Sequence, residues 1–467
     1  EISSVRATST VMCGGGETLC VRAGLEGESG ASEMLPAPFP KTLPFMTAAS
    51  RALRRFVVRR NQFHTVIAGY PWFLDWGRDT LICLRGIVSA GMLDEARGII
   101  GQFARFERDG TLPNMIRGND DRNRDTSDAP FWLSVAVRGI LDHSDDHSIL
   151  DDDCDGRPLR DVLVSIANGV LRGTPNGIRV DPASGLVYSP AHFTWMDTNY
   201  PAATPRQGYP IEIQALWFAA LSLLRDVAPE SGPWQTLADQ VAQSVLRLYR
   251  SADHQGLRDC LHATSASVPA EAALPDDACR PNQLLAVTLG LVSDPAVGAA
   301  VLRACAPLLV RGGIRSLADA PVETPVPVYR DGVLLNDPLR PYWGRYEGDE
   351  DTRRKPSYHN GTAWSWLYPS YAEALVLVYG QAARPAACSL LGALAATMES
   401  GCLGHLAEIV DGDQPHSLRG CGAQSWGVAE LLRVRSSLMS EEDVDPVGQR
   451  VGLRRSKMQN GGAGDEG

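Results

Sequence analysis

Three patterns are scarce or missing in the 467-residue sequence, and each absence excludes a class of protein. The ten cysteines are scattered without a CxxC pair, which predicts free thiols in a reducing compartment rather than a disulfide framework. No apolar run approaches about 18 residues, so we expect no membrane span. Basic residues are outnumbered, with 44 Lys and Arg against 55 Asp and Glu, and the net charge of -11 argues against a general nucleic-acid binder.

The two ends of the sequence differ in composition from its middle. Residues 1–45 are rich in Gly, Ser and Glu, which predicts a poorly ordered lead-in. The opening stretch EISSVRATST lacks the charged and apolar regions of a signal peptide, so we expect a cytoplasmic protein. Residues 440–467 are charged, end in QNGGAGDEG and predict a disordered tail. The segment 46–439 remains as one predicted domain.

This domain has the pattern of about twelve successive helices. The segment 92–106 is amphipathic, because Ile99, Phe103 and Phe106 recur at the spacing of one helix face. Segments dense in Trp and small residues alternate with more amphipathic ones, and a short hairpin interrupts them at 177–197. Twelve helices paired as six antiparallel hairpins predict an all-α fold, an (α/α)6 toroid. An open α-solenoid is the alternative, although no repeat period is visible in the residues.

Aromatic residues stand beside carboxylates at seven separated places, several of them at a helix start or in the loop before one. The apolar face of a sugar stacks on aromatic rings, its hydroxyl groups take bidentate hydrogen bonds from Asp, Glu and Arg, and cleavage of its glycosidic bond requires two carboxyl groups. The clusters therefore favour a carbohydrate site. They are Asp75, Arg78 and Asp79 with Trp72 and Trp76; Asp125 and Asp128 with Trp132; Trp195 with Asp197; Glu212 with Trp217; Tyr346 with Glu347; Tyr358 and His359 with Trp364 and Trp366; and His405 with Glu408 and Asp411.

Each cluster also has a plainer interpretation, a capped helix beside a half-buried Trp. Seven clusters in one domain argue against that interpretation for all of them. The stretch DDDCDG at 151–156 has the Asp spacing of a calcium loop, but Val162 stands where the ion requires a bidentate Glu. We therefore expect a solvated acidic loop there, and neither a metal nor another cofactor.

Several stretches follow one another in a recognisable order: TVIAGYPWFLDWGRDT, GTLPN, TSDAPFW, TWMD followed by ATPRQGYPIEIQALW, RPNQLLAV, GRYEGD, YHNGTAWSWL and GHLAEIVDGDQPHSLRGCGAQSW. This ordered set resembles the amylo-α-1,6-glucosidase domain of glycogen debranching enzymes. The resemblance implies a six-hairpin toroid of the glucoamylase type that removes single α-1,6-linked glucose stubs with inversion. There are two departures that could alter the pocket: HNGT at 359–362 replaces the usual HQGT, and Gly422 and Gly427 stand where larger side chains are usual.

The resemblance assigns catalytic roles residue by residue. The general acid of the TWMD motif falls on Asp197, and the general base of the C-terminal motif falls on Glu408, with Asp411 and Asp413 as nearby rivals. Inversion requires Asp197 to be protonated, which burial near Trp195 would favour by raising its pKa, and Glu408 to be ionised. The two carboxyl groups should stand about 6.5–9.5 Å apart to admit a water molecule.

A second set of residues is expected to hold the sugar. Arg78 and Asp79 match the pair that grips the terminal glucose in the family, and Asp128 and Glu212 match further sugar-site positions. Together with aromatic and histidine residues of the clusters, the expected substrate-binding residues are Trp76, Arg78, Asp79, Asp128, Trp195, Glu212 and His359.

The expected partner is glycogen or a branched α-glucan limit dextrin, and neither nucleic acid nor a membrane is expected. No segment resembles a glucanotransferase domain, so the transfer step would need a separate glucanotransferase or a part of the protein outside this sequence. Two other classes stay open: a non-catalytic glucan-binding protein on the same scaffold, and an α-solenoid interaction protein whose aromatics are only core. Among enzymes, the alternative is an exo-acting, glucoamylase-like hydrolase of other α-glucosides.

Overall fold

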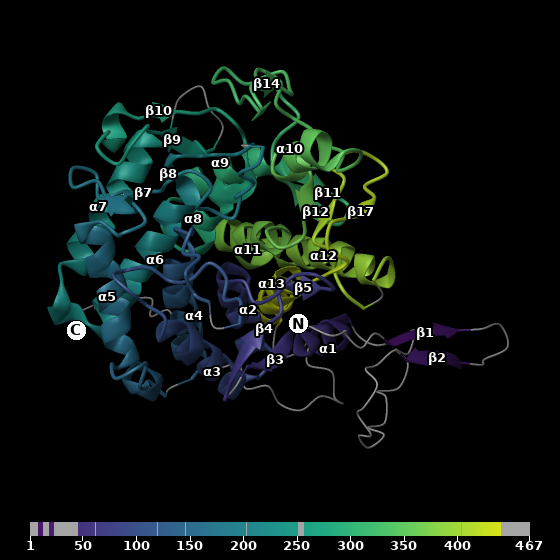
Figure 1. The fold of residues 1–467 in the computed structure, drawn as a ribbon, viewed down its shortest axis with the longest axis horizontal. Coiled ribbons are helices and arrows are strands. Elements are labelled where there is room, and N and C mark those ends of the chain that lie inside the picture. The colour runs from purple at the N-terminus through teal and green to yellow at the C-terminus, as the bar shows by residue number, and fades with distance from the viewer. Residues whose placement is uncertain are drawn as a thin grey trace, which may run out of the picture.

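The computed structural model describes residues 8–12, 18–22 and 45–439, except positions 61, 119, 145, 202, 251–255 and 403. Most of the expected lead-in and the expected tail at 440–467 lie outside the described residues. Within the lead-in, the backbone forms an antiparallel hairpin of β1 (Thr8–Met12) and β2 (Thr18–Arg22). The rest of the described chain is mainly helical (Figure 1).

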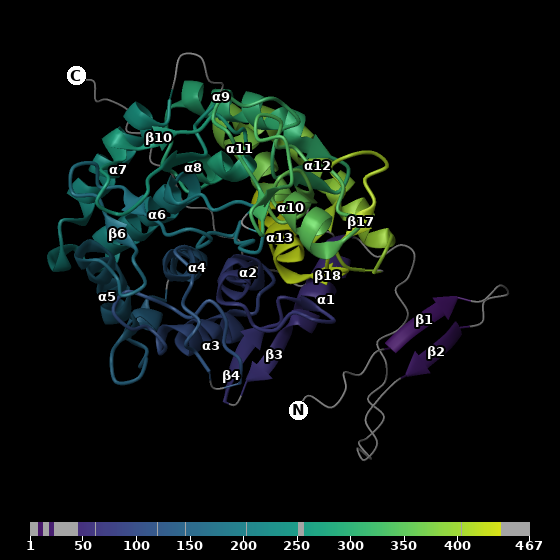
Figure 2. The same ribbon diagram turned by 45° about the horizontal axis from the view of Figure 1, so that its top comes forward.

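Six helices form a closed inner ring. α2 packs against α4, α4 against α6, α6 against α8, α8 against α11, α11 against α13, and α13 returns to α2. Figure 2 shows these helices around a common centre. The closure confirms the predicted all-α toroid and rules out an open solenoid for the described residues. The bounds are α2 (Gly77–Ser89), α4 (Ala129–His143), α6 (Ile211–Val227), α8 (Leu284–Thr288), α11 (Tyr368–Tyr379) and α13 (Ser425–Leu438).

Six further helices pack on the outside of this ring. α1 lies on α13, α3 on α2 and α4, α5 and α7 on α6, α9 on α8 and α11, and α12 on α11 and α13. The inner helices α4 and α6 are apolar nearly all round because neighbours cover them on both sides, whereas α5 and α7 bury one face. The outer bounds are α1 (Phe45–Phe56), α3 (Leu93–Ala104), α5 (Leu159–Arg172), α7 (Trp234–Leu248), α9 (Pro295–Cys305) and α12 (Arg384–Ala395).

The centre of the ring is filled by large aromatic side chains. Trp132, Trp195, Trp366 and Trp426 pack against one another, with Trp366 and Trp426 stacked at a ring distance of 5.0 Å. All four are buried. The approach of α2 to α13 depends on Gly86 in α2, because a side chain there would collide with the α13 backbone. The toroid is therefore a packed core, and space for a ligand has to come from the loops at its end.

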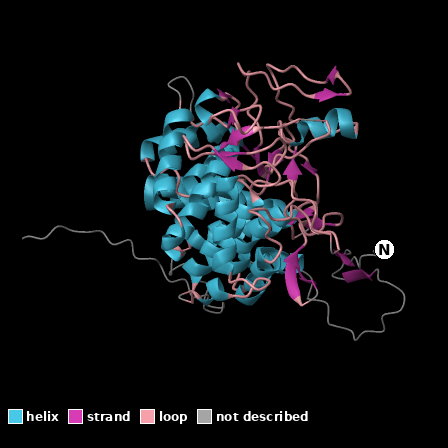
Figure 3. Ribbon diagram, turned by 60° about the vertical axis from the view of Figure 1, so that its left-hand side comes forward, coloured by secondary structure: helices cyan, strands magenta, loops and turns pink. Residues whose placement is uncertain are grey.

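Strands and long loops gather on one side of the helical body, as Figure 3 shows. The largest sheet is antiparallel and has the order β11–β12–β15–β16–β17. Its strands are β11 (Leu309–Val310), β12 (Gly313–Arg315), β15 (Ala363–Trp364), β16 (Ile409–Val410) and β17 (Leu418–Arg419). The other strands are β3 (Val57–Arg60), β4 (Phe63–Val66), β5 (Gly69–Tyr70), β6 (Arg179–Val180), β7 (Val187–Tyr188), β8 (Gly208–Pro210), β9 (Cys260–His262), β10 (Leu274–Pro275), β13 (Tyr329–Arg330), β14 (Val333–Leu334) and β18 (Ala423–Gln424).

Two segments with a helical pattern differ from the expected helices. The pattern predicts a helix throughout 361–380, but Ala363–Trp364 pairs into the sheet as β15, so α11 begins only at Tyr368. The segment 280–292 contains a 3-10 turn and the short α8. A short additional helix, α10 (Lys355–Tyr358), follows a π-helical turn at Glu350–Arg354.

One stretch, Tyr368–Glu399, is long and apolar enough to cross a membrane by length and composition alone. This differs from the expectation that no apolar run approaches that length. The stretch is bent, because Gly380 has a φ of 70° between α11 and α12, and these two helices pack against each other. It is therefore weak evidence for a membrane span, since core helices pass the same test.

Candidate active site

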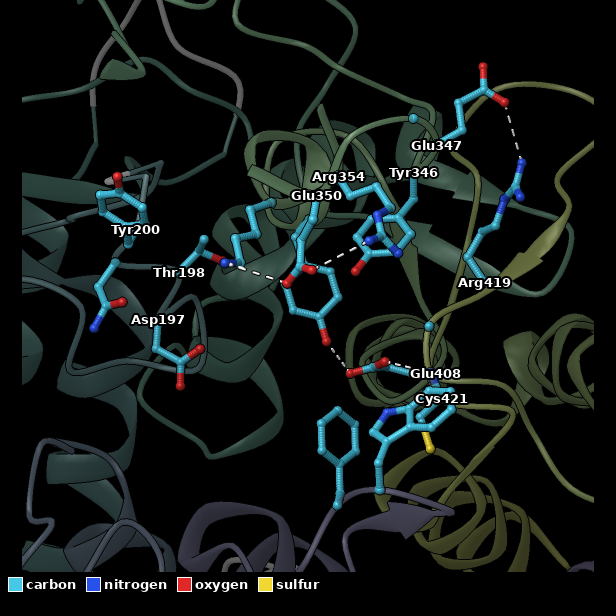
Figure 4. A pocket seen from close by; sticks show the side chains of 17 residues that line it. Asp197, Thr198, Tyr200, Tyr346, Glu347, Glu350, Arg354, Glu408, Arg419 and Cys421 are labelled. Carbon is cyan, nitrogen blue, oxygen red and sulfur yellow. Dashed lines mark hydrogen bonds and ion pairs between the residues drawn. The ribbon is translucent and has the colours of Figure 1, made fainter. Parts of the chain in front are cut away.

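A cavity of about 750 Å³ lies among the segments that lead into the inner helices. Its wall comes from four parts of the chain: 72–73 before α2, 197–200 after the β6–β7 hairpin, 346–358 before α11, and 408–421 before α13. The expected acid Asp197 and the expected base Glu408 both line it, on different walls (Figure 4). The closed toroid thus brings together two carboxyl groups that are far apart in the sequence.

Asp197 stands on the loop wall of the cavity with its side chain 34% exposed. Its Oδ2 accepts a hydrogen bond from Nη1 of Arg78 at 3.0 Å. Just before it in the loop, the carbonyl of Met196 accepts from the Thr204 hydroxyl at 3.1 Å, which holds the backbone. Burial raises the pKa of Asp197, the Arg78 cation works against that rise, and the nearby Asp128 charge adds to it.

Glu408 is buried and directly precedes β16. Its Oε1 accepts a hydrogen bond from the Tyr358 hydroxyl, and its Oε2 accepts one from the Cys421 backbone N–H at 2.8 Å. Burial raises the pKa of Glu408 to about 7, although both hydrogen bonds oppose the rise and the Asp197 charge adds to it. The neighbouring Gly420 is required, because a side chain there would collide with Oε2 of this carboxylate.

The two rival carboxylates of the same loop point to other partners. Oδ1 of Asp411 accepts from the Tyr346 backbone N–H at 2.8 Å, and its Oδ2 accepts from Arg419. Asp413 accepts from the Tyr342 hydroxyl at 2.9 Å. Neither is among the residues that line the cavity, whereas Glu408 is. The geometry therefore favours Glu408 as the base candidate.

Arg78 and Asp79 begin α2 and lie behind the acid. Nε of Arg78 donates to Oδ2 of Asp128 at 2.6 Å, and Asp128 also accepts from Thr126 at 2.6 Å. Nη2 of Arg78 is buried with no protein partner among the described residues. Asp79 accepts from Gln424 at 3.3 Å, and burial raises its pKa to about 7 against the opposing Arg78 cation. Asp128 positions Arg78, and contact of Arg78 and Asp79 with a sugar remains a prediction.

Glu212 lies in a buried ion-pair cluster away from the cavity wall. Both of its carboxylate oxygens accept hydrogen bonds from Arg206, which also binds Asp259. With both oxygens occupied in this way, the structure gives Glu212 a role in holding the fold at the start of α6, and its contact with substrate stays a prediction.

The three remaining expected binding residues are aromatic or histidine side chains. Trp195 is buried, and its Nε1 donates to Asn282 at 2.8 Å. His359 is also buried, shares a hydrogen bond with Thr198 at 2.9 Å and leaves Nε2 without a partner among the described residues. Burial lowers the pKa of His359 well below its usual value, so its ring is neutral. Trp76 is half-buried at the start of α2. None of the three lines the cavity directly.

Several lining residues stand in the clusters of the sequence but were given no role from it. Tyr358, which binds the base, opens the YHNGTAWSWL stretch, and that was the available signal. Trp72 is 62% exposed at the rim, beside the WGRDT motif. Among the residues that the structure describes, no group of three or more His, Cys, Asp or Glu side chains has the arrangement of a metal site. The rim also carries charged side chains that no motif marks: Glu350, Arg354 and Lys355.

Comparison with known proteins gives the family. A profile of amylo-alpha-1,6-glucosidase matches residues 51–433, most of the chain. The chain belongs to this family. It is accordingly a glycoside hydrolase, as the ordered motifs predict. The Saccharomyces cerevisiae glycogen debranching enzyme is 24% identical over 407 residues, covering 66% of this chain and 25% of the yeast protein. The chain thus spans about a quarter of the length of that relative.

Solved structures share the fold of this family member at low sequence identity. A GH63 mannosylglycerate hydrolase from Thermus thermophilus, in complex with glucose, has a TM-score of 0.55 and 14% identity, covering 84% of this chain and 99% of that one. A wild-type glycosidase has a TM-score of 0.54 and 15% identity, covering 84% and 96%. These likenesses confirm the toroid, and they leave the substrate open.

Proposed function

We propose that this chain removes single α-1,6-linked glucose units from glycogen or a limit dextrin, with inversion at the anomeric carbon. The proposal is supported above all by one observation: Asp197 and Glu408, assigned as acid and base from motifs in separate parts of the chain, line the same cavity. The family match and the distant likeness to the yeast debranching enzyme agree with this substrate class.

The proposed reaction needs one proton donor and one proton acceptor. Protonated Asp197 gives its proton to the glycosidic oxygen as the bond from that oxygen to the anomeric carbon breaks. Glu408 takes a proton from a water molecule, and the water oxygen attacks the anomeric carbon from the opposite face. The products are β-glucose and the debranched glucan. Arg78, whose Nη2 is buried without a partner in the described part of the chain, and Asp79 would hold the hydroxyl groups of the glucose.

The test is an assay of the purified chain on a phosphorylase limit dextrin, with the anomer of the released glucose followed by proton NMR. We expect β-glucose as the first product. Release of α-glucose would contradict inversion, because retention requires a nucleophile about 5–5.5 Å from the acid. Absence of glucose release with retained binding to the dextrin would indicate a non-catalytic glucan-binding protein, and neither binding nor release would favour an interaction scaffold.

A parallel assay on linear and other α-glucosides separates debranching from a glucoamylase-like activity. Preference for the α-1,6 stub supports the proposal, and preference for linear chains supports the alternative. We expect no transfer of maltosyl or maltotriosyl groups, so the transfer step is assigned to a separate glucanotransferase or to a part of the protein outside this sequence. The cytoplasmic location remains a prediction.

A further inference from the structure

We infer that Tyr358 is a positioning residue for the base: its hydroxyl donates to Oε1 of Glu408 and orients the carboxylate toward the attacking water. This inference rests on the proposed function and adds a residue to it. The opposite oxygen, Oε2, is held by the Cys421 backbone N–H at 2.8 Å. Two donors from different segments therefore fix the plane of this carboxylate. In Figure 4, a dashed line at the labelled Glu408 carboxylate marks the hydrogen bond that its Oε1 accepts.

The YHNGTAW motif explains how the Tyr358 ring is held. The carbonyl of Tyr358 accepts two hydrogen bonds from its own motif, from the Thr362 hydroxyl at 2.5 Å and from Nε1 of Trp364 at 2.9 Å. The ring also contacts Trp364, His359 and Tyr346 at centroid distances of 4.8, 4.7 and 5.4 Å. These contacts fix the position of the Tyr358 ring, so its hydroxyl stays directed at Glu408.

The same motif is joined to the strand that follows the base. Trp364 of β15 is paired with Ile409 of β16, the residue after Glu408. The Ser365 backbone N–H donates to the Glu408 carbonyl at 3.2 Å, and the Ser365 hydroxyl donates to the Ala407 carbonyl at 2.8 Å. Tyr358 and Glu408 thus lie beside adjacent strands of one sheet. The sheet therefore fixes the distance between the hydroxyl and the carboxylate before substrate binds.

The electrostatic surroundings give this hydrogen bond its importance. The titratable groups facing Glu408 are Tyr346, Tyr358, the Cys421 thiol and the carboxyl groups of Asp79 and Asp197. No cation among the described residues forms an ion pair with Glu408. Neutral donors therefore have to stabilise its ionised form, and the Tyr358 hydrogen bond lowers the pKa of Glu408 against the effect of burial.

Tyr358→Phe removes the hydroxyl and keeps the ring. Because the remaining environment favours the protonated carboxyl, we expect the acidic limb of the kcat profile to move up by about one pH unit, and kcat to fall about tenfold. KM should change less than about twofold, since the aromatic ring stays in place. The measurement is kcat and KM on limit dextrin from about pH 5 to 9, with folding checked by circular dichroism and thermal melting.

Tyr342→Phe is the matched control. The Tyr342 hydroxyl also donates to a carboxylate, Asp413 at 2.9 Å, but neither residue lines the catalytic cavity. We expect its pH profile to coincide with that of the unsubstituted protein. If Tyr358→Phe does not fold, Thr362→Val removes one of the two bonds to the Tyr358 carbonyl and should move the limb in the same direction by a smaller amount.

Two outcomes separate the failure of this inference from the failure of the proposed function. If Glu408→Gln is inactive on the dextrin but Tyr358→Phe keeps both the kcat and the acidic limb of the unsubstituted protein, Tyr358 does not position the base. If Glu408→Gln keeps normal turnover, the proposed function itself is wrong. A tenfold loss in Tyr358→Phe without any movement of the limb also overturns the inference, because it assigns the loss to packing alone.

Discussion

Two sides of the cavity hold the proposed catalytic carboxyl groups in different ways: the acid wall, residues 197–200, and the base wall, residues 408–421. Asp197 lies on a loop, is partly exposed and contacts the Arg78 cation, whereas Glu408 is buried beside a strand ladder and contacts only neutral donors. Burial raises the pKa of Asp197 against the opposing Arg78 cation, and so favours the protonation that an acid needs. Burial also raises the pKa of Glu408, and there it opposes the ionisation that a base needs. The surroundings of Asp197 therefore support its proposed role, whereas those of Glu408 oppose its role.

The interaction between the two carboxyl groups reduces this difficulty for Glu408, because protonation of Asp197 removes a charge that opposes its ionisation. The negative charge of Asp197 raises the pKa of Glu408, so the pair disfavours the state in which both are ionised. The state with a single proton, carried by Asp197, is the one that inversion uses. The comparison teaches that the working protonation state belongs to the pair and to the bound sugar, and cannot be assigned to either wall alone.

The largest expected effect comes from removing each carboxyl group separately. Glu408→Gln and Asp197→Asn should each lower kcat on limit dextrin by about 10²–10⁴-fold with binding retained, since an amide neither takes a proton from water nor donates one to the leaving oxygen. α-Glucosyl fluoride distinguishes the walls, because fluoride leaves without being protonated. It should restore much of the turnover of Asp197→Asn and little of that of Glu408→Gln.

The reverse pattern, in which the fluoride rescues Glu408→Gln, would exchange the two assignments. Rescue of both variants would indicate that neither group acts on the water. Binding of the dextrin to each variant, measured by calorimetry, controls for a collapsed cavity.

Arg78→Lys should have a smaller effect than removing either carboxyl group. It weakens only the hydrogen bonds that hold Asp128 and Asp197. A lysine cannot reproduce the planar fork that joins Asp128 and Asp197, so two carboxyl groups lose their shared donor. Because Arg78 and Asp128 are buried, we expect a loss of about 1–3 kcal/mol in the free energy of unfolding and about 10–100-fold in kcat/KM. Denaturant melts and steady-state kinetics measure the two losses.

The surface pair of Arg97 with Asp152 provides the control for that substitution. Nε of Arg97 also donates to a carboxylate, at 2.6 Å, but both side chains are about one-third exposed. Arg97→Lys should therefore cost less than about 1 kcal/mol and leave the kinetics unchanged. Equal losses in the two variants would show that Arg78 has no special connection with the acid.

The helices differ in how well the sequence predicts them. The helices α4 (129–143) and α6 (211–227) can be predicted from the sequence, because long apolar segments and clear turn residues define both. The start of α11 was missed, because Ala363 and Trp364 suit a helix locally and take strand pairing from β12 and β16 only in the folded sheet. Pairing across the chain leaves no periodic signal in the segment itself.

In the candidate site, too, local motifs could be predicted from the sequence and contacts between segments could not. Asp197 and Glu408 were found from motifs and do share a cavity, but the partners that set their pKa values were not found, because they come from other segments. Arg78 was expected to hold a sugar, and its contacts with Asp128 and Asp197 depend on where α2 meets the loop after β7. Distance between side chains in different elements is a property of packing, which a single sequence does not display.

The smallest expected effect concerns the stability of the base wall. Burial raises the pKa of Glu408 from 4.5 to about 7, so between these values the folded protein binds more protons than the unfolded chain. Its contribution to stability therefore falls as the pH rises through this window. Glu408→Gln carries no charge at any pH, so we expect it to melt at the same temperature as the unsubstituted protein at about pH 4.

At about pH 8 the same variant should be more stable, by about 1–3 kcal/mol or a few degrees in Tm. Asp120→Asn is the control of opposite sign. The Arg122 hydrogen bond lowers the pKa of Asp120 to about 2, so removing this carboxylate should destabilise the protein above that pH. The effect should be small, because the pair is exposed. Thermal melts of both variants at the two pH values make the measurement. The stability difference between Glu408→Gln and the unsubstituted protein could instead be the same at both pH values. That result would show that ionising the buried Glu408 does not destabilise the fold. The difference between the two walls would then lie in geometry alone.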